Sequence, residues 1–422
     1  MDLYSRNLNF QKNNIIYNAY DGIDCFAVNE VIKYFDRVFI ILRDDTRLAR
    51  FSNSLKIINN DLNILEFPAW DCLPFDRNSP NQKLIGKRVN TLFNLINLDN
   101  SKTIILSTVS SIIQKIPPKS FIIDSSLKIE IGQKISQQQL ILFFENSGYM
   151  RSNTVREDAE YSVRGSIIDV YPPGDDFPIR IDFFGNEIET IRNFDPLNQL
   201  SLKNLKEVKF YPGNELILND KSINLFRRRF RENFSNLNFD EHSYQQISER
   251  RMFNGMEHLL PLFHDELTSI FDYIDDCSIV LDKDFQLTLE SKLEDMQDFH
   301  NSRKENINSK PIAYNLLPIN QLYYNADDLN SFFKTRKIIE LNSNSSPLEI
   351  KNNYFIIKAK PGINFSSSRV KGENPIKELI NLLKVHSKIL ITCNSKSSLD
   401  RIVKLINNSD ENALRIPIVS DP

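Results

Sequence analysis

The stretch that decides the fold runs from Arg37 to Phe67 and reads RVFIILRDDTRLARFSNSLKIINNDLNILEF. It opens with a β-branched run at Arg37–Leu42 and closes with a second predicted strand at Leu62–Phe67. The polar segment Asp44–Ser54 between them is typical of a helix. A strand, a helix and a strand in this order predict a right-handed βαβ unit and therefore a parallel sheet.

The alternation of strands and helices continues beyond this stretch. A helix is predicted at Asn81–Ile96, a third strand at Thr103–Ser107, and a short helix at Val109–Ile116 that Pro117-Pro118 ends. Further strands are predicted at 278–281, 354–358, 388–392 and 416–419, and helices at 375–384 and 395–407. The polar segment His300–Asn320 is expected to be an irregular linker.

The region after Pro117-Pro118 has a different pattern. A helix at Ser136–Ser147 is followed by four short alternating strands, predicted at 161–164, 167–171, 178–184 and 187–194. We therefore predict an α/β protein in which a parallel-sheet domain, residues 1–124 and 212–338, is interrupted by a small α+β domain at 125–211. A further small α/β domain is expected at 339–422, and its end directly after a strand suggests truncation.

The last two strands of the small domain form a hairpin that can be analysed by alternation alone. Gly185-Asn186 is a two-residue turn signal, which places Phe183 opposite Ile188 and Phe184 opposite Glu187. The predicted core face holds Ile179, Ile181, Phe183, Ile188 and Thr190, and the outer face holds Arg180, Asp182, Phe184, Glu187, Glu189 and Ile191. Arg164 is predicted to point outward as well.

Arginine and aromatic residues on a polar sheet face are typical of protein-binding hot spots. The alternative is that Phe184 covers a helix edge and that the arginines are solvated, which is the more frequent case for such residues. A second local signal is the basic run Arg227–Arg231, where Phe226, Phe230 and Phe234 form an apolar stripe. Its arginines are expected to be solvated, with phosphate contact as the alternative, and Glu157, Asp158 and Glu160 are expected to be solvated too.

The composition excludes several classes of site. The net charge is -3, so any basic surface would be local. None of the 11 glycines lies five residues from another, which excludes a P-loop and predicts no nucleotide cofactor and no catalysis. The 4 cysteines are scattered, which favours reduced thiols in a cytoplasmic protein and predicts no metal site. No apolar run is long enough to cross a membrane.

Several blocks resemble one family. The sequences DAEYSVRGSIIDVYPPG (158–174), RIDFFGNEIE (180–189) and FDP (194–196) are similar to blocks shared by the bacterial transcription-repair coupling factor family, Mfd, and the excision-repair protein UvrB. Further matches to Mfd lie at Leu73–Asp76, Ser79-Pro80, Arg88, Thr91-Leu92, Gly255–Phe263 and Phe271–Tyr273. The blocks occur in the same order in the family, over nearly the whole chain.

Two differences between this sequence and UvrB distinguish the two possible relatives, Mfd and UvrB. UvrB has a P-loop near its start, whereas Tyr17–Cys25 contains no Gly-Lys-Thr, and Pro74–Thr91 is too short for the DNA-gripping hairpin of UvrB. The resemblance therefore implies the amino-terminal region of Mfd, with a degenerate RecA/helicase-like domain. The alternatives are a UvrB-like ATP-dependent repair protein and a DNA-binding module.

The resemblance also implies partners and a site. It implies that Arg164, Arg180 and Phe184 bind UvrA, which favours the binding interpretation of the outer sheet face. In the family, ATP and magnesium, RNA polymerase and double-stranded DNA are bound by regions outside this one. The full-length family member is implied to be an ATP-dependent DNA translocase.

Overall fold

The computed structural model describes residues 14–99, 101–234, 241–274, 276–309, 316–344, 354–362, 375–385 and 395–409, together with 389, 391 and 393. The chain divides into two compact units, Met1–Ala359 and Lys360–Pro422.

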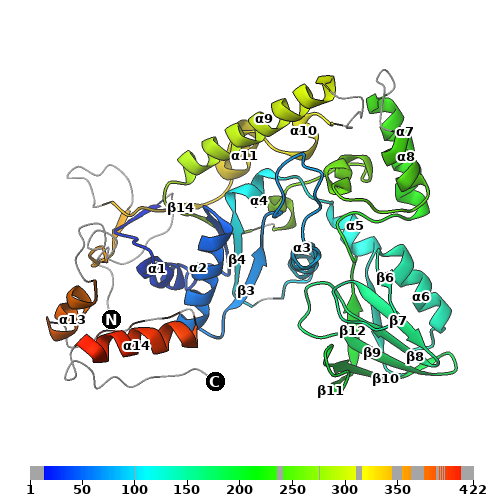
Figure 1. Ribbon diagram of the computed structural model, residues 1–422, viewed down its shortest axis with the longest axis horizontal. Helices are drawn as coiled ribbons and strands as arrows, with labels where there is room; N and C mark the ends of the chain where they lie inside the picture. The colour runs from blue at the N-terminus through cyan, green and yellow to red at the C-terminus, as the bar shows by residue number, and fades with distance from the viewer. Residues whose placement is uncertain are drawn as a thin grey trace. The chain divides into compact units, whose positions relative to one another are not determined.

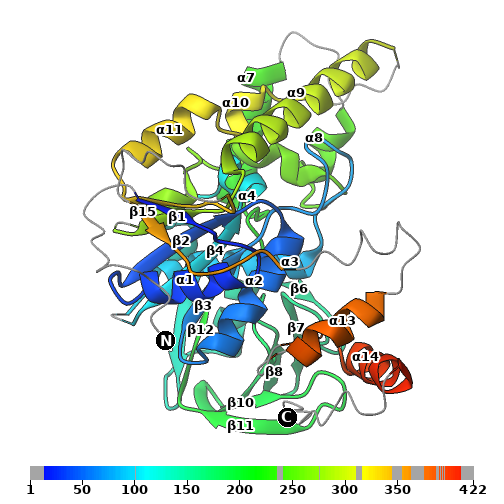
Figure 2. The same ribbon diagram turned by 90° about the vertical axis from the view of Figure 1, so that its left-hand side faces the viewer.

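A seven-stranded parallel sheet forms the centre of the first unit. Its strand order is β15-β1-β14-β13-β2-β4-β3. The strands are β1 (Asn14–Tyr17), β2 (Arg37–Leu42), β3 (Asn63–Phe67), β4 (Thr103–Thr108), β13 (Ser278–Leu281), β14 (Ile338–Leu341) and β15 (Tyr354–Ile356). The predicted α/β class and the parallel sheet are confirmed (Figure 2).

Helices cover both faces of this sheet. On one face α1 (Ile23–Val31) and α2 (Asp45–Ile58) pack against alternate strand residues such as Val38 and Ile40. On the other face Phe39 and Ile41 pack among residues of α3 (Gln82–Ile96), α4 (Val109–Ile113), α9 (Phe285–Ser309) and α11 (Ala326–Lys334). Burial on both faces explains why β2 is a continuous apolar run.

Shorter helices complete the unit. They are α5 (Lys119–Asp124), α7 (Asp220–Phe234), α8 (Glu241–Ser248), the 3₁₀ helices η1 (Met256–Leu262) and η2 (Ile270–Tyr273), and α10 (Ile319–Leu322). Residues of α7, η1 and η2 join the same core as α3 and α9.

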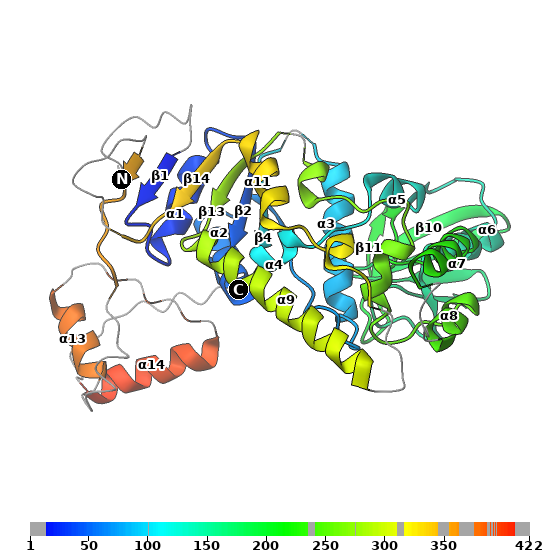
Figure 3. The same cartoon turned by 90° about the horizontal axis from the view of Figure 1, so that it is seen from above.

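Two predictions about this part were wrong. The segment predicted as an irregular linker, His300–Asn320, begins inside α9, the long helix in Figure 3. This helix forms because Phe285, Leu289 and Met296 make a narrow buried stripe along an otherwise polar sequence. The boundary predicted after residue 338 falls inside β14, which pairs with β1 and β13. Parallel pairing of β14 and β15 with β1 therefore extends the large sheet beyond that boundary.

The small α+β part follows α5. A six-stranded sheet has the order β11-β10-β9-β8-β7-β6. Its strands are β6 (Met150–Arg151), β7 (Glu160–Arg164), β8 (Ile167–Val170), β9 (Ile179–Phe184), β10 (Glu187–Phe194) and β11 (Ser201–Leu205). Helix α6 (Gln137–Asn146) lies beside this sheet (Figure 1). Its Leu140 and Phe144 belong to the core of the small domain. A two-stranded sheet of β5 (Leu127–Glu130) and β12 (Glu207–Phe210) connects it to the rest.

Two glycines allow the small domain to approach α3 closely. A Cβ atom at Gly86 would lie 2.8 Å from a carboxylate oxygen of Asp158, and one at Gly174 would lie 2.8 Å from the carbonyl oxygen of Gly86. Gly174 also has a φ of +74°, which favours glycine. The glycine that ends the Pro172-Pro173-Gly174 block therefore has a packing role.

The second unit contains the helices α13 (Pro375–Val385) and α14 (Lys396–Ser409), close to the predicted positions. The strand predicted at 388–392 lies mostly outside the described residues, and the strand predicted at 416–419 lies wholly outside them. The predicted small α/β domain at 339–422 is therefore wrong in its first part, because the strand predicted at 354–358 pairs with β1 in the large sheet, and the rest of that domain stays a prediction.

Candidate partner-binding face of the small sheet

The hairpin of β9 and β10 has the predicted register at its turn. Phe183 pairs with Ile188, and Phe184 pairs with Glu187. The side chain of Phe183 is 5% exposed and lies in the core of the small domain, whereas Phe184 is 79% exposed. Two adjacent and chemically identical residues therefore face opposite sides, as the alternation predicted.

The predicted faces were wrong beyond Ile188. The register shifts between Ile188 and Thr190, so that Thr190 pairs with Asp182 and Ile191 pairs with Ile181. Ile191 is consequently buried, and the Thr190 hydroxyl donates to the Asp182 carboxylate at 2.6 Å on the outer face. A bulge of this kind adds one residue to a strand and reverses the face of everything after it.

The outer face carries a row of polar side chains that are direct cross-strand partners. The row runs across five strands through Ser162, Asp169, Arg180, Arg192 and Asn204. Arg164 lies two residues after Ser162 on β7, the strand that pairs with β8. The sheet therefore brings Arg164 and Arg180 to the same carboxylate.

That carboxylate belongs to Asp169, a residue that the sequence reasoning missed. Arg180 donates to it through Nε at 2.7 Å and through Nη2 at 2.9 Å, and Arg164 donates through Nη2 at 2.5 Å. Asp169 is buried, although it lies on the outer face. Alternation in β8 could have placed Asp169 on the outer face, because the flanking Ile168 and Val170 point to the core, but not its contact with the two arginines.

The two arginines differ in what they present to solvent. The Arg180 side chain is 14% exposed, and its guanidinium also lies 4.5 Å from the centre of the Phe194 ring. Its hydrogen bonds to Asp169 hold the pKa of Arg180 above its usual value. The Arg164 side chain is 49% exposed. Phe184 is four residues from Arg180 on one strand, which separates their Cα atoms by about 13 Å.

This small-sheet region matches a known family model. Residues 127–216 match the model described as UvrB interaction domain. The transcription-repair-coupling factor of Rickettsia typhi is 30% identical over 392 residues, which cover 91% of this chain and 34% of the relative. The one from Haemophilus influenzae is 28% identical over 397 residues, 93% of this chain and 34% of the relative.

The chain corresponds to the amino-terminal region of the transcription-repair-coupling factors. It spans about a third of the length of these relatives. The factor of Escherichia coli is 30% identical over 316 residues, 75% of this chain and 27% of the relative.

In this coupling-factor region, the basic run on α7 makes contacts that were not predicted. The Phe226, Phe230 and Phe234 stripe is buried, as expected. Arg227 donates to Ser248, and Arg229 donates to three backbone carbonyls, those of Pro261, His264 and Asp265. The prediction of solvated arginines was therefore wrong for these two, and their guanidinium groups connect α7 to α8 and η1.

Asp158 was also wrongly expected to be solvated. Its Oδ2 accepts a hydrogen bond from the Gly174 amide at 2.9 Å, beside the Gly86 contact. Burial raises the pKa of this carboxyl. Asp158 thus holds the turn at Gly174, which packs closely against Gly86 of α3.

None of the helices in the described part of the chain is both long and apolar enough to cross a membrane. Within the same residues, no three His, Cys, Asp or Glu side chains are arranged to hold a metal ion.

Replacement of Asp169 by asparagine is expected to lower the free energy of unfolding by roughly 1.5–3 kcal/mol, the usual contribution of hydrogen bonds to a charged group. Asparagine keeps the shape of the side chain but loses the charge that holds two guanidinium groups. Denaturant melts of the chain would measure the change. The matched control is Asp182→Asn, since Asp182 pairs with Arg192 at 2.5 Å but is more exposed. A loss at Asp169 no larger than the loss at Asp182 would contradict the central role of Asp169.

Proposed function

We propose that this region of the coupling factor recruits UvrA through the outer face of the small sheet. The observation that carries the proposal is Phe184, a large aromatic side chain that is 79% exposed on a rigid hairpin. It lies within the segment that matches the UvrB interaction domain. An exposed aromatic residue that shares a sheet face with arginines is a usual composition of a binding hot spot.

The three proposed residues have different tasks. Phe184 inserts into an apolar pocket of UvrA, where its exposed ring becomes buried. Arg164 supplies a charged group from the edge of the face, and its hydrogen bond to Asp169 fixes its direction. Arg180 is more enclosed and holds Asp169 in a bidentate contact, so it both positions Arg164 and contributes part of the surface.

The role of the whole coupling factor is part of the same proposal. Recruitment of UvrA would take place in the cytoplasm at lesions where RNA polymerase has stalled. We assign contacts with RNA polymerase and double-stranded DNA, and ATP-driven translocation, to parts of the whole factor outside this region, as part of the proposal. We propose no catalysis and no ATP hydrolysis for this region.

Replacement of Arg180 by alanine is expected to weaken UvrA binding by about 1–3 kcal/mol, as is usual for an arginine hot spot. Calorimetric titration of the chain with UvrA would measure the change. Arg180→Lys should fall in between, because lysine keeps the charge but cannot make the bidentate contact. The matched control is Lys128→Ala, which removes an exposed cation on β5 that pairs with Glu207 instead. If Arg180→Ala folds normally and binds UvrA like the unchanged chain, Arg180 does not belong to the site.

A further inference from the structure

The two most exposed large apolar side chains among the described residues both belong to the small domain. They are Leu197, which is 88% exposed, and Phe184, which is 79% exposed. Leu200 and Leu202 are exposed as well, so three exposed leucines lie within the six residues 197–202. We call residues 195–202, which connect β10 to β11 and begin β11, the leucine loop. A group of exposed apolar side chains is typical of an interaction site.

The leucine loop is held by hydrogen bonds that do not involve its leucine side chains. The Asp195 carboxylate accepts from the Leu197 amide at 2.7 Å, and the Asp195 amide donates to the Leu200 carbonyl at 2.9 Å. The side-chain amide of Gln199 donates to two further backbone carbonyls. The fold of this loop therefore does not depend on burial of Leu197. A loop that is ordered before binding presents its side chains to a partner at a low entropic cost.

The leucine loop is continuous with the proposed UvrA-binding face. The Gln199 carbonyl accepts from Nη1 of Arg180 at 3.3 Å, and the Arg180 guanidinium lies 4.5 Å from the centre of the Phe194 ring, directly before the loop. Phe184 lies about 13 Å from Arg180 in the other direction along β9. Phe184, Arg180 and the leucine loop therefore follow one another along the same hairpin, with the loop at the end opposite its turn.

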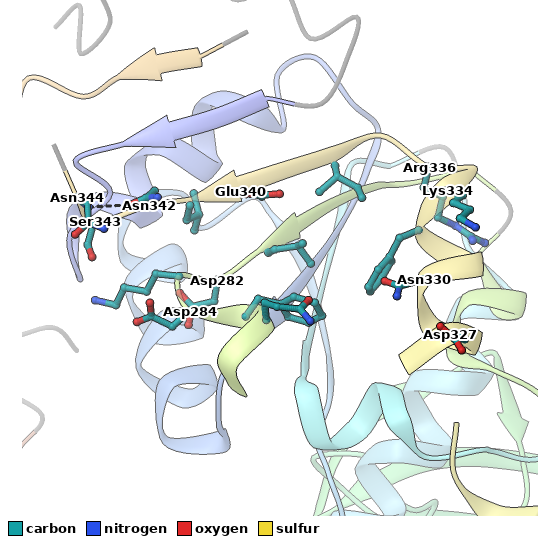
Figure 4. A pocket seen from close by; sticks show the side chains of 17 residues that line it. Asp282, Asp284, Asp327, Asn330, Lys334, Arg336, Glu340, Asn342, Ser343 and Asn344 are labelled. Atoms are coloured by element: carbon teal, nitrogen blue, oxygen red, sulfur yellow. Dashed lines mark hydrogen bonds between the residues drawn. The ribbon is translucent and has the colours of Figure 1, made fainter. Parts of the chain in front are cut away.

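The pocket at the carboxyl ends of β13 and β14 in the large sheet has a different character. Its volume is about 960 Å³, and Figure 4 shows Asp282, Asp284, Lys334 and Arg336 around it. Most of the residues that line this pocket are polar or charged, and such side chains are well hydrated without a partner. The exposed leucines, in contrast, gain free energy when a partner removes them from water. The leucine loop is therefore the surface that favours an apolar contact.

The three residues already assigned to UvrA binding are too few for a whole interface. A protein interface of standard size takes about 800 Å² and about 20–30 residues from each partner. Its hot spots are surrounded by further contacts that exclude water. The leucine loop is the exposed apolar group that follows Arg180 along the hairpin, so it supplies contact area where the proposed face needs it.

We propose that the leucine loop is a second anchor for UvrA and that it docks against an apolar patch of UvrA, next to the pocket that receives Phe184. The inference rests on the proposed function and adds the chemistry of the contact. Apolar surface is buried at both ends of the hairpin, and Arg180 meets polar groups between them. The hydrogen bond from Arg180 to the Gln199 carbonyl sets the position of the loop relative to the rest of the face.

The double variant Leu197→Ala with Leu200→Ala tests the proposal. It should melt like the unchanged chain, because surface changes rarely alter stability. We expect its Kd for UvrA, measured by calorimetric titration, to rise at least about tenfold, because apolar surface that becomes buried on binding has been removed. The matched control is Leu142→Ala with Met150→Ala, which removes two exposed apolar side chains from α6 and from β6, the opposite edge strand of the same sheet. This control should leave the Kd unchanged.

Phe184→Ala separates failure of this inference from failure of the proposed function. If Phe184→Ala weakens UvrA binding but the leucine double variant binds like the unchanged chain, the leucine loop lies outside the interface and the recruitment proposal stands. If the unchanged chain binds no UvrA, both proposals fail. Should Leu200→Ala disturb folding, Leu197→Ala alone gives the same test with a rise in Kd of about threefold.

A second copy of this chain is the other occupant of the leucine loop that the test must distinguish. Light scattering of the unchanged chain without UvrA should show a monomer. A dimer that the leucine double variant abolishes would assign the leucine loop to self-association and overturn the proposal.

Discussion

Replacement of Phe183 by alanine is expected to lower the free energy of unfolding by about 3–5 kcal/mol, whereas Phe184→Ala should lower it by less than about 0.5 kcal/mol. Phe183 lies in the core of the small domain, so its removal leaves a cavity among Ile181, Ile188 and their neighbours. Phe184 has few contacts to lose, because most of its side chain faces solvent. Denaturant melts of both variants would measure the difference.

The same pair separates stability from binding. Phe184→Ala should weaken UvrA binding by about 2 kcal/mol or more, since a buried aromatic anchor contributes that much in a typical interface. Glu187→Ala is a matched control, because Glu187 is the cross-strand partner of Phe184 and is also exposed. If Phe184→Ala unfolds the domain and Phe183→Ala abolishes binding, the two residues have exchanged roles. If neither change alters binding, the recruitment surface lies elsewhere.

The central strands β2, β4 and β13 of the large sheet could be predicted from the sequence, because they are buried on both faces. The run Val38–Leu42 contains no polar residue that would have to face solvent. Its apolar composition alone therefore indicates a buried strand. The hairpin turn was equally clear, since Gly185-Asn186 is a local signal. These features depend on residues close together in the sequence.

The features that were missed depend on residues far apart. The bulge near Glu189 arises from how β10 meets β9, and the alternation of side chains in β10 alone does not reveal it. Asp169 looked like an ordinary polar position, yet it meets Arg180 only because β8 and β9 pair in one register. The buried seam of α9 was hidden in the same way, by a polar sequence that packs against a distant core.

The binding residues themselves were identified partly by pattern and partly by resemblance. Alternation placed Arg180 and Phe184 on the outer face, and the structure confirms that face. It could not distinguish the enclosed Arg180 from the more exposed Arg164, because that difference comes from the contact with Phe194 and the loop that follows. The resemblance alone assigns UvrA to this face.

Another arginine in a motif block shows that resemblance does not by itself indicate binding. Arg88 on α3 is fully buried and donates to Glu215 at 2.8 Å and to the Pro68 carbonyl at 2.7 Å. Its guanidinium lies 4.2 Å from the centre of the Phe67 ring. The other oxygen of Glu215 accepts from the Trp70 indole at 3.0 Å. The pair connects chain segments on either side of the small inserted domain.

Replacement of Arg88 by alanine is therefore expected to lower the free energy of unfolding by about 3–5 kcal/mol, because Glu215 becomes a buried charge without its partner. The double variant Arg88→Met with Glu215→Gln should recover part of this loss, since no unpaired charge remains. Denaturant melts of the two variants would measure both values. UvrA affinity of the folded Arg88→Ala chain should be unchanged, because Arg88 is fully buried and presents no surface to a partner. If the Arg88→Ala variant folds normally but no longer binds UvrA, Arg88 is part of the binding surface and not only of the scaffold.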